Sequence, residues 1–269
     1  MNPSVLFVFI LSALLGVLRA ADLAFGTDAV TGLCLVGSVW WRYLALGIVV
    51  LAAVLVGRTQ PSRSEAVRSR RPLAGVLAFA GAVCFLAAAG AQIALGAASG
   101  LGGFVRCILE CVCSVWLSTM GRCWLSPDAW KKPFGGLYLA VAGSLLFYWN
   151  VLMRFMENSS SWHRVEPTAM VWQMLAALVF LSAMVRALWL PETSNGCQLC
   201  EAGICTFLLC FCWELPRVLV LLFHGITAAD LPEVLFGFGM CCIGALGLFT
   251  VARVAGSDGR PAIPRHAVG

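Results

Sequence analysis

The chain has 269 residues, of which 61% are hydrophobic and 12% charged, with a net charge of +5. An ordinary soluble domain is about half apolar and about a quarter charged. A soluble protein of this size cannot bury so much apolar side chain while covering its surface with so few charges. The composition therefore excludes a soluble enzyme, a disordered chain and a basic nucleic-acid-binding protein. It leaves an integral membrane protein.

Eight apolar segments follow one another along the chain, each close to the roughly 20 residues that a membrane-spanning helix needs. They cover residues 4–24, 36–56, 73–98, 104–125, 137–156, 169–190, 199–223 and 234–254. Because lipid offers the backbone no hydrogen-bond partners, each segment is expected to be a helix. The first segment lacks a preceding basic stretch, which argues against a cleaved signal peptide. The sequence thus predicts an all-α, polytopic bundle of about eight transmembrane helices.

We expect residues 1–256 to form a single multi-pass membrane domain and residues 257–269 a short cytoplasmic tail. Basic residues concentrate at alternate ends of the segments: five arginines in the loop of residues 58–71, and Arg122, Lys131, Lys132, Arg186, Arg253, Arg260 and Arg265 elsewhere. The opposite ends carry Asp22, Asp28, Glu157, Glu166, Asp230 and Glu233, with Arg164 as the exception. Because positively charged loops stay in the cytoplasm, both termini are expected there, in a protein of the cell membrane.

Polar side chains within the segments gather in the outer third of the predicted bundle. With the midpoint of each segment as zero and a rise of about 1.5 Å per residue, Glu214 lies roughly 5 Å outward and the others about 7–10 Å or slightly more. The candidate ligand-binding residues of this layer are Arg19, Arg42, Arg106, Glu110, Asn150, Glu214 and Arg217, with Gln92 and Gln173 at a similar depth. Ionisable groups are costly inside a membrane and therefore mark candidate functional sites.

Two helices carry an acid and an arginine on one face. Arg106 and Glu110 are four residues apart, and Glu214 and Arg217 are three apart, so each pair shares a helix face. Pro216 lies within the second pair, where proline frees a backbone carbonyl and can kink the helix. The similar depths of Glu110 and Arg217 make an ion pair between the two helices geometrically feasible.

Four arginines face only two glutamates in this layer, with Asp22 nearby, so a cavity formed by these residues is expected to be net cationic. The planar guanidinium group suits carboxylate and phosphate ligands. The first hypothesis is a protein that binds or transports a small anionic or amphiphilic ligand through an outward-facing pocket. The alternative is a structural or regulatory subunit of a larger complex. In that case Arg19, Arg42 and Arg106 extend to the lipid interface, and Glu214 and Arg217 only neutralise each other.

An intramembrane enzyme is the third hypothesis and ranks last, because the sequence has no HExxH, GxSxG or phosphate-loop motif. Most of the thirteen cysteines lie inside apolar segments, where free cysteine behaves as a small buried residue. Cys197 and Cys200 form a CxxC that leaves a redox role open, although no second CxxC or nearby histidine completes a zinc site. We expect no metal and no cofactor. The expected partners are the lipid bilayer, a small anionic ligand and a membrane protein, and not nucleic acid.

Small residues indicate where helices approach closely. The third segment has a row with a spacing of four that contains Ala74, Ala78, Ala82, Gly90, Ala94 and Ala98, and the eighth has Gly237, Gly239, Gly244 and Gly247. Small side chains let the backbones of membrane helices come close together. Residues 100–103, Gly-Leu-Gly-Gly, are expected to form a short turn between the third and fourth segments.

Overall fold

The computed structural model describes residues 2–28, 33–60, 65–98, 100–126, 133–156, 165–190, 195–224 and 227–256. Within these residues the α-helices are α1 (Pro3–Ala21), α2 (Val39–Arg58), α3 (Pro72–Ala94), α4 (Gly100–Leu125), α5 (Gly136–Met156), α6 (Val165–Trp189), α7 (Gly196–Thr206), α8 (Glu214–His224) and α9 (Leu231–Gly256). Three shorter helical segments are η1 (Asp22–Gly26), η2 (Glu65–Arg68) and η3 (Phe207–Trp213). Lys131, Lys132, Glu157, Arg164 and the tail of residues 257–269, with Arg260 and Arg265, lie outside the described residues.

These helices make eight spans that are long and apolar enough to cross a membrane, and the fold is all-α. The spans are Pro3–Gly26, Val39–Arg58, Pro72–Ala94, Gly100–Leu125, Gly136–Met156, Val165–Trp189, Gly196–Phe223 and Leu231–Gly256. Large apolar side chains such as Leu101 and Phe155 are exposed on the outside of the bundle, where a bilayer would cover them. The predicted number of spans is confirmed, and the chain is an integral multi-pass membrane protein.

Several helix ends differ from the ends of the apolar segments. Ser38 Oγ accepts a hydrogen bond from the Trp40 backbone N–H at 3.4 Å, so α2 begins at Val39, three residues later than expected. Residues 100–103 were expected to be a turn, but the structure makes them the first turn of α4. The helix α6 begins at Val165, before the apolar segment, and carries Glu166 in its first turn, where the helix dipole favours an acid.

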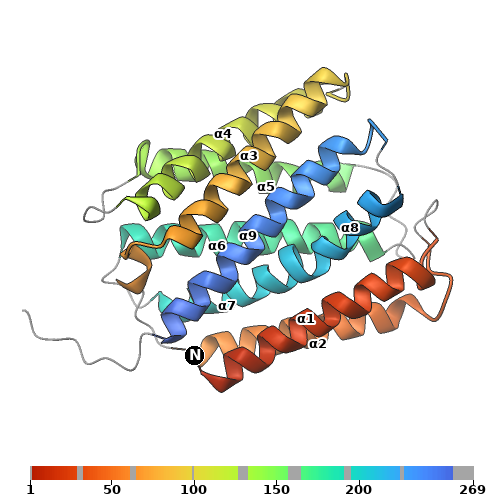
Figure 1. Ribbon diagram of the computed structural model, residues 1–269, viewed down its shortest axis with the longest axis horizontal. Helices are drawn as coiled ribbons and strands as arrows, with labels where there is room; N and C mark the ends of the chain where they lie inside the picture. The colour runs from red at the N-terminus through yellow and green to blue at the C-terminus, as the bar shows by residue number, and fades with distance from the viewer. Residues whose placement is uncertain are drawn as a thin grey trace, which may run out of the picture.

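Six of the spans close into a ring. In this ring α3 packs on α4, α4 on α5, α5 on α6 and α6 on α7, and α9 completes it by packing on both α7 and α3. Outside the ring, α1 and α2 pack on each other and on the seventh span. The start of α1 and the end of α9 lie at the same end of the bundle (Figure 1). We call the opposite end, where α1, α3 and α5 finish and α4, α6 and α9 begin, the polar end.

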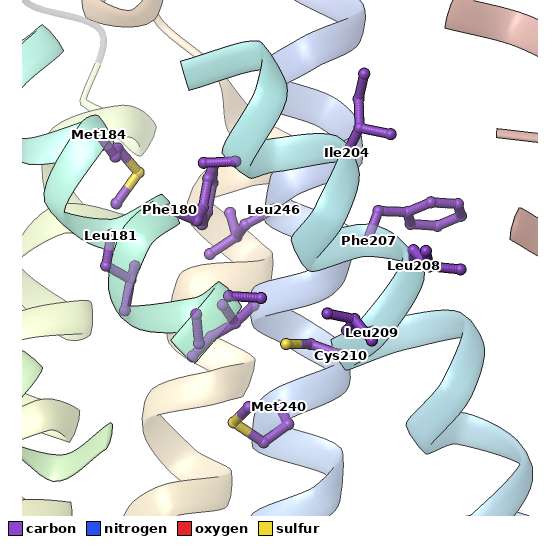
Figure 2. Packing of buried hydrophobic residues seen from close by; sticks show 14 of the residues in the cluster. Phe180, Leu181, Met184, Ile204, Phe207, Leu208, Leu209, Cys210, Met240 and Leu246 are labelled. Carbon is purple, nitrogen blue, oxygen red and sulfur yellow. The ribbon is translucent and has the colours of Figure 1, made fainter. Parts of the chain in front are cut away.

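The half of the ring nearer the chain ends is filled with apolar side chains. Figure 2 shows side chains of α6, the seventh span and α9 in this region; Phe180 of α6 and Leu246 of α9 lie next to each other there, and each is at most 1% exposed. Between α7 and α9 the backbones are in contact, since a Cβ on Gly247 would lie 2.6 Å from the Gly203 carbonyl oxygen. The predicted close packing of the glycines in the eighth span is confirmed. In lipid, such contacts stabilise through van der Waals packing.

The seventh span widens into the π-helix η3 just before Pro216. The distortion expected from this proline is therefore present. Proline has no N–H for the carbonyl of Cys212, four residues earlier, and α1 approaches that carbonyl so closely that a Cβ on Gly16 would lie 2.6 Å from its oxygen. The Leu209 carbonyl of the π-helix accepts a hydrogen bond from Gln173 Nε2 at 3.1 Å. The irregular turn thus offers backbone acceptors to side chains of the bundle interior.

Candidate functional site

A cavity of about 500 Å³ lies inside the ring at the polar end. Its volume falls within the range of small-molecule sites, roughly 300–1,000 Å³. The lining comes from α3, α4, α5, α6, α8 and α9, and its polar members are Gln92, Arg106, Asn150, Arg154, Gln173, Glu214, Arg217 and Glu233. Because these helices belong to six different spans, the cavity forms only when the ring has closed.

Arg106 is the centre of one polar cluster, which joins α3, α4 and α9. Its Nε lies 3.0 Å from Glu110 Oε1 and its Nη1 lies 2.8 Å from Glu233 Oε1. The amide of Gln92 donates to both oxygens of Glu110, at 2.9 and 3.0 Å. The guanidinium also lies over the ring of Phe236, 4.9 Å from its centroid, which adds a cation–π attraction. The fully buried Glu110 is thereby held by a charge and by hydrogen bonds, which burial of a carboxylate requires.

Arg217 is the centre of a second cluster, which joins α6 to the seventh span. Its Nε donates to Glu214 Oε1 at 3.0 Å and lies 3.2 Å from Glu166 Oε1. The other oxygen of Glu214 accepts from Gln173 Nε2 at 3.0 Å, and the same amide nitrogen donates to the carbonyl of Leu209. The exposed fraction of the Glu214 residue is only 2%. This acid therefore depends on Arg217 and Gln173 for its hydrogen bonds.

A third group of contacts connects α1 and α2 to the second cluster. Arg19 Nη2 lies 3.1 Å from Glu166 Oε2, and its Nη1 lies 2.9 Å from Asp22 Oδ2. Arg42 Nε donates to both oxygens of Asp22, at 3.0 and 2.9 Å. The guanidinium of Arg19 stands over the ring of Trp213 at 4.8 Å from its centroid. Glu166 thus bridges Arg19 and Arg217. The polar layer therefore continues from the ring into α1 and α2, which pack outside it.

The seven residues predicted for the site divide into two groups. Arg106, Asn150, Glu214 and Arg217 line the cavity, whereas Arg19, Arg42 and Glu110 do not. Glu110 lies behind Arg106, and Arg19 and Arg42 lie beside the cavity, connected to it through Asp22 and Glu166. Asn150 turns its amide to its own helix and donates to the Leu146 carbonyl at 2.8 Å.

Two possibilities that the sequence left open do not occur in the structure. Glu110 and Arg217 do not pair, because each is engaged by a residue of its own helix, Arg106 and Glu214 respectively. Arg19, Arg42 and Arg106 do not extend to the lipid interface either, since their side chains are 4%, 12% and 21% exposed and each binds a carboxylate. The inward ion pairs replace the contact with water that snorkelling would provide.

The described residues of the polar layer carry equal numbers of positive and negative charges, but the cavity lining keeps an excess of one positive charge, with Arg106, Arg154 and Arg217 against Glu214 and Glu233. Five arginines (Arg19, Arg42, Arg106, Arg154 and Arg217) are matched by five acids (Asp22, Glu110, Glu166, Glu214 and Glu233) among the described residues. Hydropathy assigned Glu166 and Glu233 to loops, but α6 and α9 begin before both residues. Their carboxylates therefore enter the layer, and Glu233 reduces the excess of positive charge in the cavity lining to one.

Arg154 lines the cavity but was not among the candidate site residues predicted from the sequence. It lies one helical turn beyond Asn150, so extending the same depth calculation by four residues would have found it. Its Nη2 lies 2.8 Å from Met170 Sδ, and thioether sulfur is a weak acceptor. Met153, Met174 and Met240 also line the cavity. These flexible, polarisable side chains can adapt to an apolar group of irregular shape.

The cysteines of the described residues are all free thiols, and about half of them are buried. Cys200 of the CxxC is buried and Cys197 partly exposed. No group of three or more His, Cys, Asp or Glu residues in the described part of the chain is placed to hold a metal ion. What the cavity offers to a ligand is therefore guanidinium groups, carboxylates, amides and thioethers. Comparisons with protein-family models, curated protein sequences and solved structures find no match for this chain.

Proposed function

We propose that this membrane protein binds a small amphiphilic ligand with an anionic head group in the polar-end cavity. The observation that carries the proposal is the mixed lining of one closed ring: guanidinium groups of Arg106, Arg154 and Arg217 together with the thioethers of Met174 and Met240. Arginine binds carboxylate and phosphate groups through its planar fork. Apolar walls with a few convergent polar groups are typical of small-molecule sites.

The apolar part of the cavity lining favours an amphiphile over a simple inorganic anion. A small, highly charged anion would lie among Glu214 and Glu233 as well as the arginines, and its binding would have to disrupt existing ion pairs. A longer molecule can place its anionic group near Arg154 and Arg106 and its apolar part along the wall that runs inward to Met240. From Glu233 to Met240 this wall extends about 10 Å at about 1.5 Å per residue.

We further propose that the cavity faces the outside of the cell membrane and that both chain ends are cytoplasmic. The support is the charge of the opposite end, where Arg58, Arg68, Arg122, Arg186 and Arg253 lie at or near helix ends. Arginines in short loops favour the cytoplasmic side. Transport of the ligand would then require opening of the packed core around Phe180, Leu208 and Leu246, which closes the ring below the cavity.

The proposal is tested by binding of radiolabelled decanoate to the protein in phosphatidylcholine nanodiscs, with empty nanodiscs as the blank. Saturable binding is expected for decanoate, with competition by decyl phosphate and none by decyltrimethylammonium, whose head group is cationic. Arg154→Gln should weaken binding about tenfold, the loss expected for one charge-assisted hydrogen bond. Decanoate that binds only in proportion to lipid, or equal competition by the cationic amphiphile, would refute the proposal.

Arg122→Gln is the matched control, because Arg122 is an exposed arginine at the opposite end of α4 from the cavity. It should bind decanoate as the unchanged protein does. Uptake of decanoate into proteoliposomes that contain only this chain separates transport from binding. A protein that binds decanoate without accelerating its uptake is a binding protein, and one that does both is a transporter.

The completeness of the ion pairs favours a second function, that of a structural or regulatory subunit. Glu110, Glu166 and Glu214 each already have an arginine partner, so the layer can be stable with no ligand. Extraction in a mild detergent tests this: a second membrane protein that co-purifies in a fixed ratio, together with no saturable decanoate binding, would support the subunit role.

A further inference from the structure

A second hollow lies on the side of the bundle, between α2 and α6. Both helices pack on α7 but barely touch each other, which leaves a groove with a volume of about 530 Å³. Its walls are apolar over most of their length and include Val50 and Val54 of α2, Leu175 and Val179 of α6 and Cys205 of α7. Leu175 and Val179 are 44% and 54% exposed. We call this hollow the lateral groove.

The lateral groove lies within membrane-spanning segments and runs along them. On α6 it extends from Arg186, three residues before the end of the span, inward past Leu175. From Arg186 to Trp172, the farthest α6 residue of its lining, the groove is about 21 Å long at about 1.5 Å per residue, which exceeds the roughly 15 Å of hydrocarbon in one leaflet. In a bilayer the surroundings of such a groove are lipid tails, and it is long enough to hold one acyl chain.

Polar groups line this groove mainly at the end nearer the chain termini. They are Arg186 of α6 and Gln198 and Glu201 of α7. The carboxylate of Glu201 is engaged by Arg58, with 3.5 Å between Arg58 Nε and Glu201 Oε2. Arg186 is exposed and forms no ion pair with any acid of the described residues. At interface depth the groove therefore ends in a guanidinium that has no acidic partner among the described residues.

We propose that the lateral groove binds one anionic phospholipid of the surrounding bilayer. One acyl chain lies along Val179 and Leu175, and the phosphate is held by Arg186 with the amide of Gln198 beside it. Basic residues between helices near the cytoplasmic face are a known way to hold anionic head groups. The apolar wall alone would accept any lipid tail, and Arg186 supplies the preference for negative charge. This site is separate from the polar-end cavity and does not depend on the function proposed for it.

Native mass spectrometry of the detergent-purified chain after incubation with dioleoyl phosphatidylglycerol or dioleoyl phosphatidylcholine tests the proposal. We expect one phosphatidylglycerol to remain bound at activation energies that remove phosphatidylcholine. Arg186→Gln should reduce the bound fraction of phosphatidylglycerol about tenfold, as loss of a charge-assisted hydrogen bond predicts. Arg253→Gln is the control, because Arg253 is an exposed arginine near the same end of the bundle and outside the groove. Inorganic phosphate alone should not displace the lipid, since it lacks the acyl chain.

A second variant tests the groove itself without removing a charge. Ser182→Trp places a large ring in the groove from an exposed position and should exclude the lipid while the protein stays folded. Ser144→Trp is its control, since both serines donate to the carbonyl three residues earlier in their helix, at 2.7 Å for Ser144 and 2.8 Å for Ser182, and Ser144 lies outside the groove. Elution as a single species on gel filtration verifies folding. Equal retention of phosphatidylglycerol by Arg186→Gln and Arg253→Gln, or by both tryptophan variants, overturns the proposal.

Discussion

The two ends of the bundle use arginine differently. At the polar end Arg19, Arg106 and Arg217 each contact carboxylates of two different residues. At the opposite end Arg68 donates instead to the Leu188 carbonyl, at 3.0 and 2.6 Å. There, burial and the nearby positive charge of Arg253 lower the pKa of Arg71 to about 10.

This difference separates two uses of charge in a membrane protein. Arginines paired with acids across helices connect spans to one another. Removing one partner leaves the other partner's charge uncompensated in a region of low dielectric constant. Among the described residues of the opposite end, arginines outnumber acids, and the resulting net positive charge is what the positive-inside rule detects. The polar end is thus expected to be sensitive to substitutions of single charges. The opposite end is expected to be sensitive to packing and tolerant of changes in charge.

The largest effect is expected from Glu110→Leu. The substitution leaves Gln92 without its acceptor and Arg106 with only the half-exposed Glu233, so the free energy of unfolding should fall by about 3–5 kcal/mol. Unfolding by dodecyl sulfate in mixed micelles, followed by circular dichroism, measures it. Glu233→Gln is the matched control, because its carboxylate binds the same arginine but is 47% exposed; it should cost about 1 kcal/mol or less. Equal losses would contradict the claim that the buried pair holds this cluster together.

Gly247→Ala tests the packing of the other half of the ring. Its new methyl group would meet the Gly203 carbonyl oxygen at 2.6 Å, and separating α7 from α9 should cost about 1–3 kcal/mol of unfolding free energy. Gly90→Ala is the control, because nothing lies within 4 Å of its added Cβ. Alanine favours a helix over glycine, so this control should leave the protein equally stable or more stable. A neutral Gly247→Ala in the same assay would refute the packing argument.

Glu166→Gln should have a smaller effect, because the side chain is 32% exposed. Losing the bridge between Arg19 and Arg217 should lower the unfolding free energy by about 1 kcal/mol. A double-mutant cycle with Arg19→Met gives the coupling between α1 and the ring. Strict additivity of the two substitutions would show that the 3.1 Å contact of Arg19 with Glu166 contributes no coupling energy.

The sequence predicts the architecture well because membrane spans obey one strong rule. A helix must satisfy its own backbone in lipid, so eight apolar stretches of sufficient length are enough to predict eight spans. The prediction fails at helix ends. Glu166 and Glu233 interrupt the apolar pattern but not the helix, and treating them as loop residues overestimated the positive charge of the polar layer. Depth alone placed Arg106, Asn150, Glu214 and Arg217 in the correct layer.

Side-chain direction could not be predicted in the same way. The row of small residues on α3 illustrates this: Ala74, Ala78 and Ala82 are buried, whereas Gly90 and Ala94 are exposed. Residues spaced four apart shift gradually around a helix of 3.6 residues per turn. The row therefore turns from the buried face of α3 to its exposed face toward the C-terminal end of the helix. Glu110 and Arg217 likewise have similar depths but do not pair, because depth does not say in which direction a side chain points from its helix. Neighbouring helices decide the pairing, and one sequence does not give their order around the ring.

The smallest effect is expected from Arg58→Gln, at the end of the bundle away from the cavity. Arg58 forms an ion pair with Glu201 at 3.5 Å, but its side chain is 67% exposed, and such pairs contribute about 0.2–1 kcal/mol at most. The change in unfolding free energy should therefore stay within about 0.5 kcal/mol. Retention of phosphatidylglycerol should be unchanged or slightly lower, because Glu201 of the lateral groove loses the arginine that neutralises it. Removing one of the five arginines in the loop of residues 58–71 should leave orientation unchanged, because the remaining four keep the loop basic. A loss as large as that of Glu110→Leu would mean that charges at the two ends contribute equally to stability.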